Sequence, residues 1–365
     1  MFYDLGSTLA SLGYVAIGFE SSQDYFNATF PLTSAQLTSA PPSATPPYNS
    51  SVVGFDPDLK LPYTLQYNAA IEQALSRSDS VTIGYVGSGA RRLLTEFSTY
   101  PGAVGNPNFT ASTTLDLVQG RAASGYNSLQ TKYQRTLSKG IQVLVSYTWS
   151  HSIDDASSNF GNYELLRGSS DFDIRHDLQA AATVLLPGAK DWGKAVAALA
   201  SKWALDFRFQ ARTAVPVDIV GNEDLDLQTG QYLAYQPSLV SGQPLYLYGH
   251  SYPGGRIINY DAFQIEPDGT QGDLPRNYAR AFGALQLDTA VRRDFAIRDK
   301  LHLQARAEAF NVFNHPMFGP IYSALSYGPS LFGQAYNTLN GLGNLNSLYQ
   351  SGGPRSLQVS LKFSF

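Results

Sequence analysis

Apolar and polar residues alternate with a period of two in several stretches of the chain, which predicts β-strands. The clearest stretch runs from residue 355 to the last residue. Its apolar positions are Leu357, Val359, Leu361, Phe363 and Phe365. One wholly apolar face is typical of a barrel strand with lipid on one side and a polar lumen on the other. An antiparallel strand packed on a soluble core gives the same pattern, so this stretch alone leaves both interpretations open.

The same alternation predicts four hairpins before this closing strand. We expect strand pairs at 63–75 with 81–91, 128–137 with 141–151, 177–186 with 201–213, and 284–296 with 300–313. One or two weaker strands are expected within the first 20 residues, roughly at 2–10 and 12–20. The stretches between the pairs are rich in Gly, Pro, Ser and Asn and predict loops. These expected loops are 21–62, 92–125, 152–176, 215–283 and 314–354.

Short and long connections alternate along this predicted strand order. Long structureless loops are uncommon in compact soluble domains, whereas outer-membrane barrels combine short periplasmic turns with long external loops. The pattern therefore predicts an all-β fold, an antiparallel transmembrane β-barrel segment of about 9–11 strands. We expect either an incomplete, open barrel or a small barrel that closes on itself. The closing strand would then end on the periplasmic side.

The charges of the predicted strands agree with this interpretation. On strand 301–310 the polar residues share one face, and on strand 202–212 Asp206 and Arg208 lie opposite the aromatic face. Two arginines, Arg135 and Arg293, fall on the apolar face, but both lie close to short turns. At that depth their side chains can reach the headgroups, and the cost of burying an arginine charge in lipid is avoided.

The composition argues against several other classes of protein. Charged residues make up 15% of the 365 residues, and the formal net charge is −4. Such a surface does not attract nucleic acid. The chain has no cysteine, so it offers no disulfide, thiolate metal site or cysteine nucleophile. It contains no apolar run long enough for a transmembrane helix, and the N-terminal stretch lacks the positive region of a signal peptide.

Several segments contain recognisable sequence motifs. SYTWSHSIDDASS at 146–158, RGSSDFDIRHDL at 167–178 and RAEAFNVFNHPMFG at 306–319 resemble the Oar-like, TonB-dependent-receptor-type outer membrane proteins of Acidobacteria. LPYTLQYNAAIEQAL at 61–75, IGYVGSGARRL at 83–93 and the ending GGPRSLQVSLKFSF add to the resemblance, which covers nearly the whole chain in order.

The resemblance implies a location in the bacterial outer membrane and a barrel of about 22 strands in the intact relative. Residues 1–365 would form the C-terminal part of that barrel, without the plug, signal peptide and carboxypeptidase-regulatory-like domain that relatives carry. The implied partners are outer membrane lipid, the barrel-assembly machinery, the missing N-terminal barrel half with its plug and, through it, TonB. The terminal aromatics Phe363 and Phe365 would form the signal read by the assembly machinery.

Candidate chemistry is sparse. Asp154, Asp155, Asp171 and Asp173 could supply oxygen ligands to Ca²⁺, but their spacing fits no defined calcium loop, and turn and loop-packing roles explain them better. His151, His176 and His315 are not accompanied by a catalytic motif, so we expect neither an enzyme nor a cofactor. A hydrogen-bonded network at the loop base is the expected role of Asp171, Asp173, Arg175 and His176. Tyr147 and Trp149 suit an aromatic girdle at the long-loop end.

The expected function is therefore that of a wall segment in a TonB-dependent-receptor-like transporter. Its solute would be a glycan, a peptide or a metal chelate, taken up or bound at the surface. Two alternatives stay open on the sequence: a surface adhesin or structural protein of the same membrane, and a secreted soluble β-sandwich that binds carbohydrate.

Overall fold

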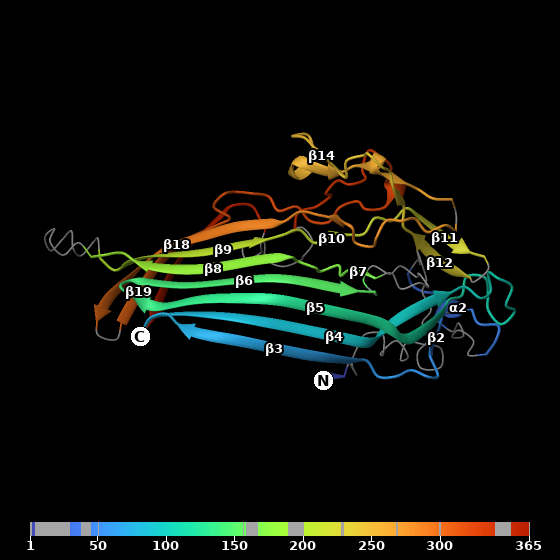
Figure 1. Cartoon of the computed structure of the whole chain (residues 1–365), viewed down its shortest axis with the longest axis horizontal. Coiled ribbons are helices and arrows are strands. Elements are labelled where there is room, and N and C mark those ends of the chain that lie inside the picture. The colour runs from blue at the N-terminus through green and yellow to red at the C-terminus, as the bar shows by residue number, and fades with distance from the viewer. Residues whose placement is uncertain are drawn as a thin grey trace.

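The computed structural model describes residues 2–3, 30–37, 45–49, 51–155, 157, 167–188, 201–227, 230–267, 269–298, 301–339 and 352–364. Within these residues the chain forms one large twisted antiparallel sheet with a layer of loops at one end (Figure 1). The main strands follow the sequence, each pairing with the next one along the chain. They are β1 (Phe2–Tyr3), β3 (Tyr63–Ala74), β4 (Asp79–Thr99), β5 (Leu115–Ser138), β6 (Ile141–Asp154), β8 (His176–Leu185), β9 (Trp203–Arg212), β18 (Ala284–Arg298), β19 (Leu301–Phe310) and β20 (Ser356–Ser364).

This order confirms the predicted hairpins and the all-β antiparallel architecture. The sheet does not close: β20 pairs with β19, and in the described part of the chain no strand pairs with its other edge. At the opposite edge β3 pairs, among the described residues, with the two-residue β1. In Figure 1 the strands β19 and β20 curl away behind the others. The sheet is therefore a curved, open wall.

The two ends of the sheet differ, as the loop pattern predicts. The hairpin turns and the C-terminus lie at one end, on the left of Figure 1, and the long connections lie at the other. The turn between β5 and β6 has positive φ at both Lys139 (51°) and Gly140 (79°). This conformation matches the two-residue hairpin turn whose twist suits antiparallel strands.

The loop predictions for residues 92–125 and 21–62 are wrong in part. Strand β4 continues to Thr99 and β5 begins at Leu115, so much of 92–125 is β-sheet. The register shifts between Ala90 and Leu94, and Arg92 has a positive φ of 56°. This bulge breaks the period-two alternation and hides the continuing strand. Within 21–62 the structure places a short helix, α2 (Ser34–Leu37), and a strand, β2 (Val52–Phe55), that runs parallel to β5.

The predicted loop 215–283 also contains regular structure. Its strands are β10 (Pro216–Val217), β11 (Asn222–Asp226), β12 (Gln231–Tyr235), β13 (Ser238–Leu239), β14 (Tyr246–Tyr248), β15 (Arg256–Ile258), β16 (Phe263–Gln264) and β17 (Ala279–Arg280), with 3₁₀ turns η2 (Pro253–Gly255) and η3 (Tyr260–Ala262). The following loop contributes η4 (Leu325–Tyr327), and β7 (Gly168–Ser169) extends the edge of β6. Strands this short show no alternation that a sequence could reveal. We call residues 213–283 and 311–339 the loop layer.

The loop layer holds the main hydrophobic core. Its buried residues are Ile219, Ile258, Ala262, Phe263, Leu274, Ala279, Leu325 and Phe332. The ring of Phe332 is fully buried and meets the rings of Tyr260 and Phe263 edge to face, at centroid distances of 5.6 and 5.7 Å. The loops therefore fold as a packed unit.

None of the described residues forms a comparable layer over the apolar face of the main sheet. The strand registers place the apolar positions of neighbouring strands side by side, as in Tyr85 with Leu129 and Leu129 with Trp149. On β20 Leu357 and Val359 are each 78% exposed. A continuous exposed apolar face is unusual for a soluble domain. In the part of the chain that the structure describes, no helix is both long and apolar enough to cross a membrane.

Candidate functional site

The polar face of the sheet carries a network of charged side chains. Asp206 of β9 accepts hydrogen bonds from Arg306 of β19 at 2.6 Å and from Arg292 of β18 at 3.1 Å. Thr183 of β8 donates to the other oxygen of Asp206 at 2.8 Å, and Arg306 also pairs with Glu308 at 2.9 Å. The network joins side chains of four neighbouring strands. The alternation in the sequence places these side chains on one face of the sheet.

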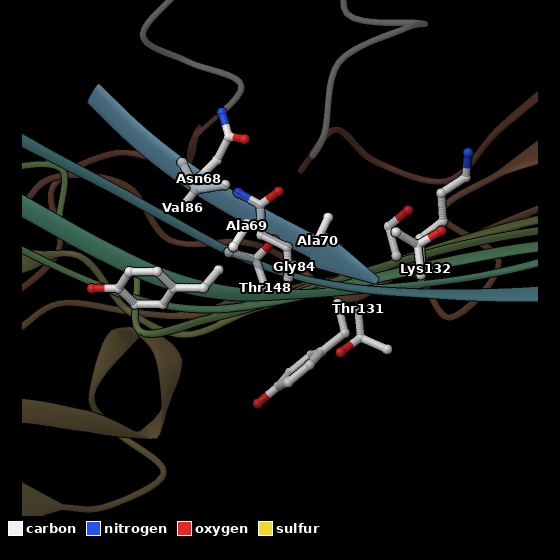
Figure 2. Close-up of a pocket in the computed structure, with 13 residues that line it drawn as sticks. Asn68, Ala69, Ala70, Gly84, Val86, Thr131, Lys132 and Thr148 are labelled. Atoms are coloured by element: carbon white, nitrogen blue, oxygen red, sulfur yellow. The ribbon is translucent and has the colours of Figure 1, made fainter. Parts of the chain in front are cut away.

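A depression lies farther along the sheet, where β3, β4, β5 and β6 meet (Figure 2). Its volume is about 340 Å³. Asn68 and Lys132 project to one side of the sheet in Figure 2, and Thr131 projects to the other. Gly84 faces Ala70 in the register of β3 and β4, and these small residues leave the space open. The polar face can therefore hold water or a small polar solute here.

Arg276 fastens the loop layer to the loop after β6. Its guanidinium is 2% exposed and donates to a carboxylate oxygen of Asp154 at 2.9 Å and to the carbonyl oxygen of the same residue at 2.6 Å. It also donates to the carbonyl oxygens of Ser157 and Gly168. A Cβ added at Gly168 would lie 2.7 Å from the carbonyl oxygen of Arg276, so only glycine allows this approach. Arg276 thus holds two loops together.

A second contact of the same kind involves Asp173, whose side chain is 1% exposed. Arg280 donates to it at 2.8 Å, Arg175 at 2.9 Å and the backbone N–H of Ser152 at 2.8 Å. Burial raises the pKa of Asp173, but the hydrogen bonds from Ser152, Arg280 and His151 outweigh burial and hold this pKa below its ordinary value. The carboxylate therefore stays charged. We call the contacts of Arg276 and Arg280 with Asp154 and Asp173 the arginine clamp.

Asp218 is a buried carboxylate in the loop layer itself. It is 8% exposed and accepts hydrogen bonds from the side-chain amide of Gln236 at 3.2 Å and the backbone N–H of Asn277 at 3.0 Å. Burial raises the pKa of Asp218 to about 6, against these hydrogen bonds. Its protonation therefore changes near neutral pH.

The four aspartates considered as calcium ligands occupy separate contacts. Asp154 and Asp173 belong to the arginine clamp, Asp171 accepts from the side-chain amide of Asn277 at 2.7 Å, and Asp155 accepts from the backbone N–H of Ala123 at 2.6 Å. Among the described residues no three His, Asp or Glu side chains lie close enough together to hold a metal ion. The carboxylate oxygens instead face protein donors.

The two histidines at the ends of that loop are engaged separately. His151 lies 3.1 Å from Asp173 and 3.2 Å from a guanidinium nitrogen of Arg175. His176 does not join this network: its ring stacks on Tyr147, and its Nδ1 lies 2.7 Å from the hydroxyl oxygen. The structure therefore brings Asp173 together with Arg175 and His151, whereas Asp171 contacts Asn277 and His176 lies at the sheet surface.

The expected aromatic girdle residues lie on the apolar face. Trp149 is 54% exposed near the long-loop end of β6, and Phe363 is 60% exposed near the short-turn end of β20. The terminal residue Phe365 lies outside the described residues. At the short-turn end, Arg293 lies over the rings of Trp203 and Phe295, 5.4 and 4.4 Å from their centroids. This arrangement suits a charged group at a membrane interface.

Arg135, the other arginine of the apolar face, also lies at the short-turn end. It pairs with Asp79 at 3.3 Å, and Tyr133 donates to the same oxygen at 2.7 Å. The position of both arginines near the turns agrees with the sequence expectation. Their partners Asp79 and Trp203 were missed, although the strand register alone would place Asp79 opposite Arg135 and Trp203 opposite Arg293.

The match to a family model decides the nature of the exposed apolar face. Residues 1–358 match the model described as an outer membrane beta barrel domain. The chain belongs to this family. The domain lies in the bacterial outer membrane, with its apolar face against lipid. The soluble β-sandwich alternative is therefore wrong, and the exposure of the apolar side chains on this face gives the physical reason.

Solved structures of outer membrane proteins are similar to this barrel domain over part of their length. The outer membrane transporter YddB from Escherichia coli has a TM-score of 0.49 and 12% identity, covering 87% of this chain and 34% of YddB. The ferripyoverdine receptor of Pseudomonas aeruginosa has a TM-score of 0.43 and 14% identity, covering 84% of this chain and 28% of the receptor.

The barrel domain thus spans about a third or less of the length of these solved proteins. The ferric-catecholate import receptor Fiu from E. coli gives the same proportion, with a TM-score of 0.39, 9% identity and coverage of 84% of this chain and 28% of Fiu. A search of curated proteins gives no match.

Proposed function

We propose that this barrel domain is the C-terminal wall segment of a TonB-dependent-receptor-like transporter. The solute would be a glycan, a peptide or a metal chelate, bound at the surface or taken up. The observation that carries the proposal is the charged network of Asp206, Arg292 and Arg306 on the face opposite the lipid. A wall that holds ionised groups on its inner side faces a water-filled lumen.

The open edges of the sheet support the proposal that more strands complete the wall. Unpaired backbone groups are costly in hydrocarbon, where no water can satisfy them, so spanning sheets close. We infer that the edge of β20 pairs with strands of an N-terminal barrel half, which would also bring a plug and its contact with TonB. Oar-like receptors provide the pattern for this arrangement.

The folded loop layer and the arginine clamp would stand above this lumen. A packed core and buried ion pairs hold the loops in one arrangement, which lowers the ordering cost of binding a solute. Adhesion without transport would use the same surface. Uptake in cells that lack TonB separates the two activities, because energised transport requires TonB and surface binding does not.

The test uses the full-length gene in a strain deleted for it. Labelled ferric chelates, oligosaccharides and peptides are offered, and binding at the surface is measured separately from accumulation inside the cell. We expect accumulation of one class of solute that is lost in the strain lacking TonB. Surface binding that persists without any accumulation in either strain would contradict transport and leave adhesion.

We also propose that Phe363 and Phe365 form the signal for the barrel-assembly machinery. Phe363 lies exposed on the apolar face, and the alternation places Phe365 on that face as well. Phe365→Ala should lower the amount of folded protein in the outer membrane, measured by heat-modifiable gel mobility, whereas Ser364→Ala should not. Equal assembly of the two variants would contradict the signal.

A further inference from the structure

A cavity of about 350 Å³ opens at the long-loop end of β9, inside the loop layer. It lies between the end of β9, the segment 215–220, the segment 281–282 and the segment 318–323. This volume is within the range of small-molecule sites in proteins. It is separate from the depression of Figure 2, which lies between β3 and β6 on the sheet.

The walls of the cavity are mainly apolar and held in place. The lining side chains include Val215, Val217, Val220, Phe282, Phe318 and Ile321. The rings of Phe282 and Phe318 pack against each other at a centroid distance of 5.2 Å. Arg256 lies over Phe282 at 5.1 Å and donates to the carbonyl oxygen of Ala281, which fixes the backbone beside the ring. The apolar wall is therefore formed before any ligand binds.

Two charged residues line this cavity, and they differ in whether their side chains already have hydrogen-bond partners. The carboxylate of Asp218 already accepts hydrogen bonds from Gln236 and Asn277. The side chain of Arg212, the last residue of β9, makes no hydrogen bond or ion pair in the part of the chain that the structure describes, although Asp177 lies opposite it in the register. A guanidinium presents five donors in a fixed fork. Arg212 is therefore the polar group of the cavity with unused binding capacity.

A guanidinium beside an apolar cavity suits an anion with an apolar body. Carboxylates bind arginine through two parallel, charge-assisted hydrogen bonds, and an apolar or aromatic body fills a pocket lined by phenylalanine and valine. We propose that the cavity binds a small apolar carboxylate, with its carboxylate on Arg212 and its body against Phe282 and Phe318. The inference adds a solute class to the three proposed above, and it rests on the proposed function only for its role in uptake. Binding itself can be measured without transport.

The test uses a matched pair of probes, 3-phenylpropionate and its neutral amide, with the product of the full-length gene in nanodiscs. Binding is measured by saturation-transfer difference NMR. The acid should bind at least about tenfold more tightly than the amide, since a charge-assisted hydrogen bond is worth that factor or more. Arg212→Met should remove this preference while both probes keep contact with the apolar wall.

Arg208→Met is the matched control, because Arg208 lies on the same strand and face as Arg212 but does not line the cavity. It should retain the preference for the acid. Phe318→Ala should weaken both probes, and heat-modifiable mobility shows that each variant is folded. Absence of binding, equal binding of acid and amide to the unmodified chain, or a preference that survives Arg212→Met would overturn the proposal. If binding is as expected but cells show no uptake, the result would contradict transport and leave the binding proposal standing.

Discussion

Replacement of Arg276 by methionine should detach the loop layer from the loop after β6. The change removes a buried guanidinium that donates to a carboxylate oxygen and the carbonyl oxygen of Asp154 and to two further carbonyl oxygens. Removing one partner of a buried ion pair costs about 3–5 kcal/mol. Asp154 keeps two hydrogen bonds from Ser157, at 2.7 and 2.6 Å, so we expect the lower end of this range.

A loss of about 3 kcal/mol corresponds to an opening equilibrium roughly a hundredfold more favourable. Native-state hydrogen exchange with mass spectrometry measures this change in peptides from residues 213–283. The strands β3 to β6 should keep their protection from exchange, because the contacts of Arg276 are with Asp154, the last residue of β6, and with the loop that follows it. The expected result is local opening of the loop layer, with the sheet intact.

Arg175→Met is a graded control. Arg175 also pairs with a buried carboxylate, that of Asp173, but its own side chain is 40% exposed, and Arg280 remains on the same carboxylate. Its effect on exchange should be much smaller than that of Arg276→Met. Unchanged protection of 213–283 in Arg276→Met, or equal effects of the two substitutions, would refute the role assigned to burial in the arginine clamp.

Three further predictions concern the sheet and Asp218. Val145→Arg on the lipid face should lower stability in bilayers by about 2–4 kcal/mol, whereas Ser146→Arg on the polar face should not; equal urea midpoints would contradict the assignment of faces. Gly140→Ala should destabilise by about 1–2 kcal/mol because φ is 79° there, and Gly125→Ala, with open space around its Cβ, is the control. Because burial raises the pKa of Asp218 from 3.8 to about 6, the contribution of Asp218 to the stability of the loop layer is greatest below pH 4, and roughly 3 kcal/mol of it is lost as pH rises from 4 to 6. Asp218→Asn should flatten this dependence in hydrogen exchange, and an unchanged slope would exclude Asp218 as its source.

The main strands could be predicted from the sequence because lipid and water impose a strict alternation on them. β20 shows this most directly, with Leu357 and Val359 exposed on one face and Ser360 on the other. The prediction failed where a local irregularity interrupts the period, as at the bulge near Arg92. Beyond this bulge β4 and β5 continue as strands, which alternation could not reveal.

The arginine clamp could not be predicted for a different reason. Arg276 and Asp154 are 122 residues apart in the sequence, and each lies in a segment without periodic pattern. Asp154 and Asp173 were identified as candidates from their oxygen chemistry, but the same chemistry serves a cation from solution or a guanidinium from another loop. Only the folded loop layer determines which cation is close. The role proposed for Arg212 could not be predicted because the sequence does not show what surrounds this residue.

The path of the chain between β9 and β18 affects the order in which the sheet assembles. The two strands are direct neighbours, yet the chain builds most of the loop layer between them. Bringing the ends of a flexible loop together costs entropy that grows with loop length, and contacts between distant residues form slowly. Here β10 pairs with β17, so Pro216 lies opposite Arg280, close to the register of Arg212 with Ala284. A loop layer that folds first would hold β9 and β18 in register, and the sheet would then join as two preformed halves.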